Sequence, residues 1–164
     1  MSAITLPGNV ASMPALSLRQ PWAWFVTRPD LTDPAERAAA LAKGWIKTIE
    51  NRDWPTRFRG DFLIHAGKLM PMADYDAALL FIELYVDPEL VHQVPDPAEL
   101  QRGGVVGMAT LTDCVTSHTS GWFTGGFAEP GGDVGYGYVL QDAKPLPFIP
   151  WKGMQKFFNV RVRP

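Results

Sequence analysis

A short segment in the first half of the chain concentrates side chains that could recognise a base. Lys47, Glu50 and Arg52 lie within six positions, and Trp54 follows two residues later. A carboxylate beside a guanidinium stays ionised and keeps a fixed orientation, which suits hydrogen bonding to a base edge. Trp54 could stack on the same base. The segment therefore predicts a binding site for a base in RNA or in a free nucleoside.

The same residue types could also support catalysis. Lys47 or Lys68 could stabilise charge that develops on a phosphate, while Glu50 or His65 moves protons. His65 ends an apolar run, a position that suits a residue lining a cleft. Cleavage of RNA without a metal would use the 2′-hydroxyl as the nucleophile. A metal-independent ribonuclease with Lys47, Glu50 and His65 as its catalytic residues is therefore the alternative hypothesis.

Structural roles compete with these functional ones. Glu50 and Arg52 could form an ion pair that closes the fold, and His65 could donate to a backbone carbonyl. In a regular strand these two charged residues share one face, and Lys47 joins them only if the chain is irregular near Gly44. A purely structural cluster would suit a protein-interaction domain, and Glu50→Gln would then cost ~3–5 kcal/mol. If Glu50 is instead kept for a ligand, Glu50→Gln should change the free energy of unfolding by less than ~1 kcal/mol.

Six tryptophans in 164 residues are a second feature of the chain. Trp22, Trp24 and Trp45 are expected in the core. The other three lie in or beside predicted loops, and an aromatic face beside a cation is a common way to hold single-stranded RNA bases. These three residues, which favour the binding hypothesis, are Trp54, Trp122 and Trp151.

Composition limits the classes of partner. The formal net charge is −2, so strong, sequence-independent binding to nucleic acid through bulk charge is not expected, and any such contact needs a local basic cleft. Five lysines and arginines between positions 47 and 68 could supply that cleft. A single cysteine, the lack of a signal-peptide pattern and the lack of a long apolar run predict a cytoplasmic protein without a membrane partner.

The pattern of elements predicts an α+β domain built on a small barrel. Residues 1–13 are expected to form a flexible leader and 14–164 a single domain. Helices are expected at 22–26, 34–43 and 71–86, and Asp33 caps the second of them. About six short strands are predicted, with candidate segments at 15–18, 45–51, 61–65, 105–115, 136–140, 146–149 and 157–162.

Three sequence blocks in this order, at 16–23, 47–55 and 59–68, resemble the ASCH family, small β-barrels related to the PUA RNA-binding domains. The resemblance implies a PUA-like barrel with two or three peripheral helices that binds RNA or a modified base. The helix at 34–43 looks like an insertion. One bacterial branch of the family hydrolyses an acetylated cytosine nucleoside with a lysine and a threonine three residues later. Lys47 matches that lysine, but Glu50 stands at the threonine position.

The candidate residues are expected to form one site. RNA or a nucleoside-type ligand is the expected partner, and a nucleoside-directed hydrolase is a further alternative. No cofactor is expected, and no metal site is expected because the three histidines lack ligands at the spacing of zinc motifs. The expected ligand-binding residues are Gln20, Trp22, Lys47, Glu50, Arg52, Trp54, His65, Lys68 and Trp122.

Overall fold

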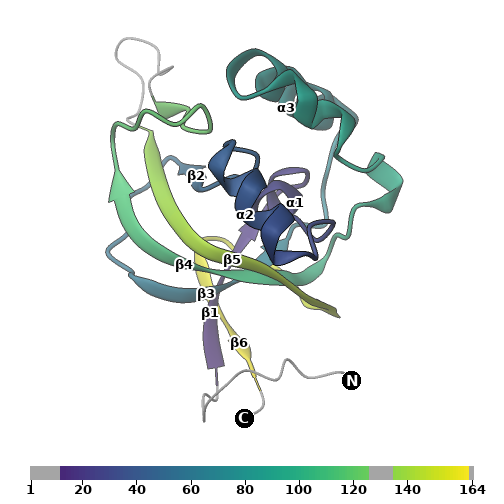
Figure 1. Ribbon diagram of the computed structural model, residues 1–164. Helices are drawn as coiled ribbons and strands as arrows, with labels where there is room; N and C mark the ends of the chain where they lie inside the picture. Colours follow the sequence, from purple (N-terminus) through teal and green to yellow (C-terminus); the bar gives the residue numbers. More distant parts are fainter. Residues whose placement is uncertain (1–11, 126–134, 163–164) are drawn as a thin grey trace.

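A computed structural model describes residues 12–125 and 135–162, which form an α+β fold (Figure 1). The α-helices are α1 (Trp22–Thr27), α2 (Pro34–Ala42) and α3 (Met72–Tyr85), and two short 3₁₀ helices follow, η1 (Pro88–His92) and η2 (Pro97–Glu99). The strands are β1 (Ser12–Leu18), β2 (Ile49–Arg52), β3 (Gly60–Ala66), β4 (Gly104–Val115), β5 (Tyr136–Pro150) and β6 (Phe157–Arg161).

The six strands form one sheet that curls into a half-barrel (Figure 1). Their order across the sheet is β2-β5-β4-β3-β1-β6. The α+β class is confirmed, and the sheet is compatible with the predicted barrel but open, because its edge strands β2 and β6 do not pair with each other in the described part of the chain. Long β4 and β5 form the bent wall, and register shifts between them relieve the strain of curling.

Strands β1 and β3 pair in parallel, with Ser17 opposite His65 and Leu18 opposite Ala66. Parallel neighbours end at the same edge of a sheet. The residues that follow both strands, Arg19 on one side and Lys68 on the other, therefore emerge close together. This register places two of the three sequence blocks, those at 16–23 and 59–68, at one edge of the half-barrel.

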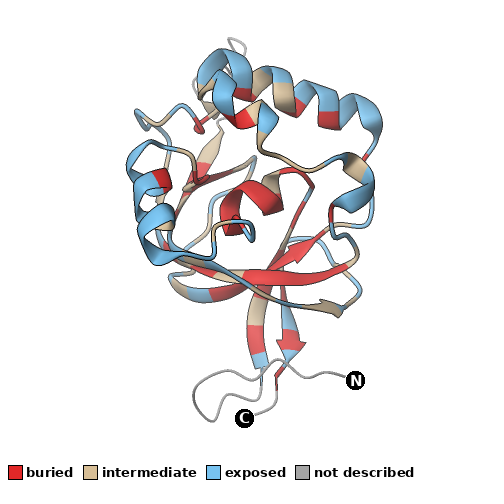
Figure 2. Ribbon diagram, turned by 45° about the vertical axis from the view of Figure 1, so that its right-hand side comes forward, coloured by how far each residue is buried: buried red, intermediate tan, exposed pale blue. Residues whose placement is uncertain are grey.

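Helix α1 fills the concave side of the sheet and packs against β3, β4 and β5. Every residue of the helix except Trp22 is buried, as Figure 2 shows for the segment at the centre of the fold. A helix that is apolar on nearly all sides is stable only inside a core. Leu16, Ile64 and Tyr138 meet it from the sheet and complete the main apolar cluster.

Strand β2 is shorter than the sequence predicts, because the strand expected at 45–51 begins only at Ile49. Gly44 adopts a positive φ of 77° after α2, and the Trp45 N–H bonds back to the Ala40 carbonyl. The Lys47 N–H then bonds to the Phe25 carbonyl instead of a neighbouring strand. The irregularity near Gly44 that the sequence left open is therefore real.

Two further boundaries differ from the sequence prediction. Ser12 and Met13, assigned to the leader, belong to β1, while residues 1–11 lie outside the described part of the chain. The segments expected as two strands at 136–140 and 146–149 form one continuous β5. Asp142, at a φ of 52°, lies between them, and shifts of register let the strand pass its prolines without breaking.

The N-terminus of α2 is capped as predicted. The Asp33 carboxylate accepts a hydrogen bond of 3.1 Å from the Glu36 backbone N–H, and Pro34 occupies the first turn. We expect Asp33→Ala to lower the free energy of unfolding by about 1 kcal/mol, because one N–H of the first turn loses its acceptor. Urea denaturation checks this value, with Asp33→Asn as the control that keeps a capping oxygen. Equal losses in both variants would contradict the capping role.

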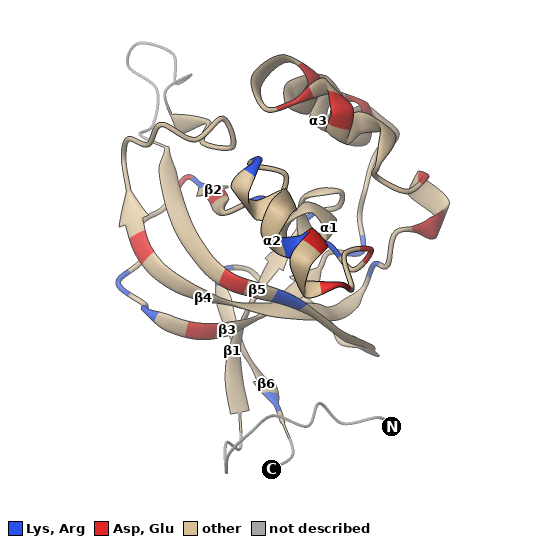
Figure 3. Cartoon of the chain, in the orientation of Figure 1, with Lys and Arg blue, Asp and Glu red and all other residues tan. Residues whose placement is uncertain are grey.

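Acidic residues gather on α3 and the segment after it (Figure 3). Seven of the 17 acidic residues of the chain lie between positions 74 and 99, and no lysine or arginine does. The charge of the molecule is therefore strongly uneven although its net value is small.

No helix in the described part of the chain has the length and apolar character needed to span a bilayer.

Candidate functional site

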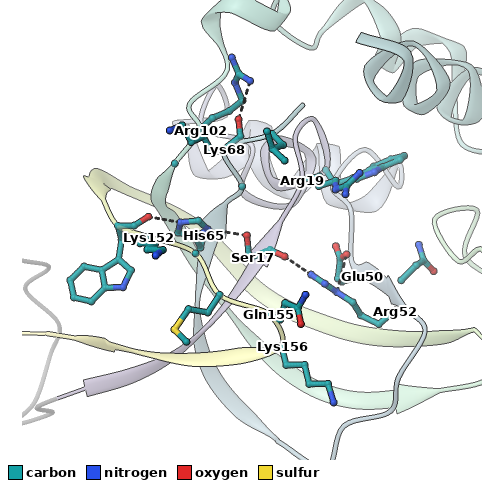
Figure 4. Close-up of a pocket in the computed structure, with 18 of the residues that line it drawn as sticks. Ser17, Arg19, Glu50, Arg52, His65, Lys68, Arg102, Lys152, Gln155 and Lys156 are labelled. Atoms are coloured by element: carbon teal, nitrogen blue, oxygen red, sulfur yellow. Dashed lines mark hydrogen bonds and ion pairs between the residues drawn. The ribbon is translucent and has the colours of Figure 1, made fainter. Parts of the chain in front are cut away.

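A cleft of about 1560 Å³ opens where β1, β2 and β3 reach the same edge of the half-barrel. The segment between β5 and β6 forms its opposite wall (Figure 4). Of the predicted site residues it contains Trp22, Lys47, Glu50, Arg52, Trp54, His65 and Lys68. The fold therefore brings most of the predicted site residues together around one cleft.

The lining of the cleft is strongly basic. It holds two of the 17 carboxylates of the chain, Glu50 and Asp53, but seven of its 15 lysines and arginines. A concave surface with one sign of charge attracts ligands of the opposite sign. The cleft therefore has the electrostatic character of a site for an anion. The seven basic residues are Arg19, Lys47, Arg52, Lys68, Arg102, Lys152 and Lys156.

Glu50 lies between two cations at the base of the cleft. Its carboxylate accepts from Lys47 Nζ at 2.9 Å, and Arg52 Nε lies 3.5 Å from its other oxygen. Lys47 Nζ also donates to the Ile49 carbonyl and lies 5.6 Å from the centre of the Trp22 ring. Arg52 Nη2 donates to the Ser17 carbonyl at 2.6 Å. The three charged side chains thus form one connected group that joins β2 to β1.

Burial of Lys47 and Glu50 determines how much this charged group contributes to stability. Lys47 is only 2% exposed and Glu50 7%. Desolvation lowers the pKa of Lys47 from its ordinary value, although the neighbouring Glu50 carboxylate acts in the opposite direction. Glu50 is therefore well satisfied without a ligand, and the small change in stability that the sequence suggested for Glu50→Gln is not what this geometry predicts.

His65 has partners on both ring nitrogens. Nδ1 lies 3.0 Å from the Ser17 hydroxyl oxygen, and Nε2 lies 2.7 Å from the Trp151 carbonyl oxygen. The side chain is 1% exposed and packs edge-on against Phe158. Both the cleft position and the bond to a backbone carbonyl that the sequence considered are present together. His65 therefore lines the cleft as an almost fully buried side chain that contacts Ser17.

Two tryptophans offer aromatic surface beside cations. Trp54 is half-buried, packs edge-on against Tyr138 at 5.5 Å between ring centres, and has Lys156 Nζ 5.7 Å from its own centre. Trp22 is also half-buried and meets Phe81 edge-on at 6.1 Å. Edge-on packing against these neighbours fixes the planes of the two rings. Both residues line the cleft and are suited to stack on a base.

Gln20 and Trp122 are not among the residues that line the cleft. The Gln20 side chain is 3% exposed, accepts from the Trp24 backbone N–H and donates to the Gln101 carbonyl. Trp122 is 2% exposed and donates from its indole N–H to the Gly44 carbonyl. Gln20 fixes the start of α1 and Trp122 anchors the turn before β2. Both side chains are buried and used for hydrogen bonds within the fold, and their predicted contact with a ligand stays a prediction.

Several lining residues were not singled out from the sequence. Ser17 and Arg19 precede the glutamine-proline-tryptophan motif at 20–22, so their proximity to it was a usable signal. Lys152 and Lys156 lie in the segment after Trp151, where a tryptophan next to a lysine was already visible. Arg102, which donates to the Lys68 carbonyl at 3.1 Å, carries no signal in the sequence. Only the tertiary fold brings it to the cleft.

Comparison with known proteins adds no family to this geometry. No protein-family model matches the chain, and no curated protein gives a significant match. The described residues also contain no cluster of three or more histidine, cysteine, aspartate or glutamate side chains that could hold a metal ion. The charge, shape and hydrogen bonds of the cleft are therefore the features that bear on function.

Proposed function

We propose that this chain is an ASCH-type, PUA-like domain that binds RNA or a nucleobase or nucleoside, modified or not, in the basic cleft. The observation that carries the proposal is the concentration of seven cations and only two carboxylates around one cavity in a chain of net charge −2. Phosphate groups are the anions that such a cleft would attract. The three sequence blocks that resemble the ASCH family meet at this cleft, which supports the same assignment.

The cleft also has groups suited to a base. Trp22 and Trp54 provide aromatic faces on which a base can stack, each with a lysine ammonium 5.6–5.7 Å from the ring centre. Glu50 can accept from an exocyclic amine, because ionised carboxylate oxygens have several acceptor sites and Lys47 occupies one oxygen. Phosphates would meet the outer lysines and arginines. The bound species would therefore be an unpaired nucleotide, not a duplex.

Binding is favoured over cleavage of RNA by the position of His65. A ribonuclease that uses His65 needs a ring nitrogen within reach of the 2′-hydroxyl. Both ring nitrogens already have partners within the protein, and the side chain is almost fully buried. Direct proton transfer between His65 and a 2′-hydroxyl of RNA would require the unreacted Ser17 hydroxyl to leave Nδ1, or the Trp151 carbonyl to leave Nε2. Recognition requires no such change.

Titration of fluorescent single-stranded RNA against salt tests the proposal. We expect the double variant Lys152→Glu/Lys156→Glu to weaken binding at least about tenfold at moderate salt, because two phosphate contacts become repulsive. The slope of log K against log salt should flatten by roughly 1 to 1.5, since each contact to a single strand contributes about 0.7.

Lys144→Glu is the control, and the single variant Lys152→Glu carries the same change of charge inside the cleft. Lys144 is an exposed lysine on β5 and does not line the cleft, so exchanging it for glutamate should leave affinity and slope nearly unchanged. Free nucleosides titrated by calorimetry would separate base recognition from phosphate attraction. Undetectable binding of every RNA and nucleoside to the folded wild-type protein would refute the proposal. Equal losses in both variants would move the site away from the cleft.

A further inference from the structure

A hydroxyl, an imidazole and a backbone carbonyl form a chain of hydrogen bonds at the wall of the cleft. Ser17 Oγ lies 3.0 Å from His65 Nδ1, and His65 Nε2 lies 2.7 Å from the Trp151 carbonyl oxygen (Figure 4). We propose that Ser17 is a nucleophile, activated by His65, and that the cleft hydrolyses carboxylic esters that carry a negative charge. This activity goes beyond the proposed binding of RNA or nucleosides and does not depend on it.

The hydrogen bonds fix the tautomer of the imidazole. A carbonyl oxygen can only accept, so His65 Nε2 carries the hydrogen that it donates to Trp151. In the neutral ring Nδ1 is then the acceptor, and the Ser17 hydroxyl donates to it. This is the arrangement that a general base needs before it removes a proton from a serine. The Trp151 carbonyl would also stabilise the imidazolium that forms, because Nε2–H remains its donor.

Ser17 is more exposed than His65, as expected for a nucleophile that meets the substrate and a base that supports it. Ser17 is partly exposed and lines the cleft, while His65 lies behind it and is 1% exposed. A ligand in the cleft therefore meets the hydroxyl first. The register of β1 and β3 holds the two residues opposite each other on adjacent strands, so their separation is set by the sheet and not by a loop. Rigid placement of both groups favours a nucleophile–base pair.

A glycine allows the outer wall to approach this pair. A Cβ atom on Gly153 would lie 2.7 Å from His65 Cε1 and 3.4 Å from Ser17 Oγ, so the backbone at position 153 rests directly on the two side chains. The same segment carries the Trp151 carbonyl that orients the imidazole. Any larger residue at position 153 would press on His65. The close approach of the Gly153 backbone therefore helps to hold the His65 ring in place.

The reaction balances without a cofactor. Ser17 Oγ bonds to the ester carbonyl carbon as its proton passes to His65 Nδ1, and the bond to the alcohol oxygen then breaks as Nδ1 returns the proton to it. The alcohol leaves and an acyl group remains on Ser17. Water next gives a proton to Nδ1 and adds to the acyl carbon. The bond to Oγ then breaks, the proton returns to Oγ, and a carboxylic acid leaves.

The charge of the cleft defines the class of ester. Arg52 Nη2 donates to the backbone carbonyl of Ser17, and both residues line the cleft, so a guanidinium lies beside the proposed nucleophile. The other cations of the lining would hold a carboxylate or phosphate elsewhere on the substrate. An ester with an anionic group should therefore react faster than a neutral one of the same reactivity. Salt should reduce this preference.

A small fluorophosphonate probe followed by mass spectrometry tests the nucleophile directly. We expect one covalent adduct on wild-type protein, mapped to Ser17, with no adduct in Ser17→Ala and a full adduct in the control Ser117→Ala, which changes an exposed serine outside the cleft lining. Hydrolysis of 4-nitrophenyl hydrogen succinate should exceed that of 4-nitrophenyl acetate. Ser17→Ala should reduce the enzymatic rate at least about 100-fold, and His65→Gln should do the same.

Two results would overturn the inference. One is the absence of both adduct and ester turnover in wild-type protein that is folded by circular dichroism. The other is turnover that Ser17→Ala leaves intact. RNA titration of the same wild-type preparation keeps the two proposals separate. Ester hydrolysis without RNA or nucleoside binding would refute only the proposed function, and binding without hydrolysis or adduct would refute only this inference.

Discussion

Replacing Glu50 with glutamine is expected to lower the free energy of unfolding by about 3–5 kcal/mol at pH 7, because it leaves a buried cation without its counter-charge. Lys47 is 2% exposed and its ammonium lies 2.9 Å from the Glu50 carboxylate. The glutamine amide could still accept a hydrogen bond, but it supplies no negative charge. Urea denaturation measures the loss, with Asp53→Asn as the control.

The control Asp53→Asn removes a carboxylate that is exposed, so it separates the effect of burial from the loss of a negative charge. Asp53 is the other carboxylate of the cleft lining and is exposed, so Asp53→Asn should change stability by less than about 0.5 kcal/mol. A double variant, Lys47→Met/Glu50→Gln, removes both buried charges. It should be clearly more stable than the sum of the two single losses predicts, since the buried Lys47 charge is gone and only Arg52, whose side chain is 21% exposed, loses its counter-charge. A loss under about 1 kcal/mol for Glu50→Gln alone would restore the view that Glu50 is held only for a ligand.

The cost of Glu50→Gln should also depend on pH. Desolvation already lowers the pKa of Lys47 from its ordinary value of 10.5, and the Glu50 charge opposes that shift. Without this charge the pKa of Lys47 in the folded state falls further, while in the unfolded state it does not change. The folded variant then binds fewer protons than folded wild type, so its stability rises more steeply with pH. The difference between the two proteins should therefore shrink between pH 7 and pH 9.5.

Local signals in the sequence predict the elements of this fold well. Asp33 caps α2 as expected, and the apolar run that ends at His65 forms a buried strand. Both predictions rest on interactions within a few residues, which the sequence displays directly. The start of β2 was placed too early because Trp45 and Ile46 suit a strand. The left-handed turn at Gly44 and the bond from Lys47 to α1 decided otherwise.

The candidate site was predictable only in part, for a physical reason. Lys47, Glu50 and Arg52 are neighbours in sequence, so their meeting needed no knowledge of the fold. Gln20 and Trp122 carry polar groups that the fold uses for backbone hydrogen bonds, and sequence alone does not distinguish such a group from a free one. The wall at 150–156 comes from a segment about 100 residues away, and only the curl of the sheet brings it to the cleft.

A second buried cation supports the fold away from the cleft. Arg28 is 1% exposed and directly follows α1. Its guanidinium donates to the Trp45 carbonyl at 2.6 Å and to the Gln93 side chain at 2.8 Å, and its carbon lies 4.7 Å from the centre of the Trp24 ring. It also forms two bonds to Asp30. One side chain thus joins α1, the turn before β2 and the segment after η1.

Arg28→Met is expected to lower the free energy of unfolding by about 3 kcal/mol. Methionine keeps an apolar stem of similar length, but the Trp45 carbonyl and the Gln93 amide lose their donor, and each such loss costs about 1–3 kcal/mol. Arg28→Lys should recover only part of the loss, because an ammonium cannot reproduce the fork of the guanidinium. Urea denaturation at pH 7 provides the comparison.

Asp30→Asn shows which contacts of Arg28 matter. The Asp30 side chain is 40% exposed, so its ion pair with Arg28 should contribute under about 1 kcal/mol. A small loss for Asp30→Asn and a large one for Arg28→Met would assign the stability to the buried acceptors and to Trp24. Similar losses in both variants would mean that the ion pair dominates. Arg28 does not line the cleft, so a variant that remains folded should still bind RNA or a nucleoside with wild-type affinity, which separates support of the fold from recognition of the ligand.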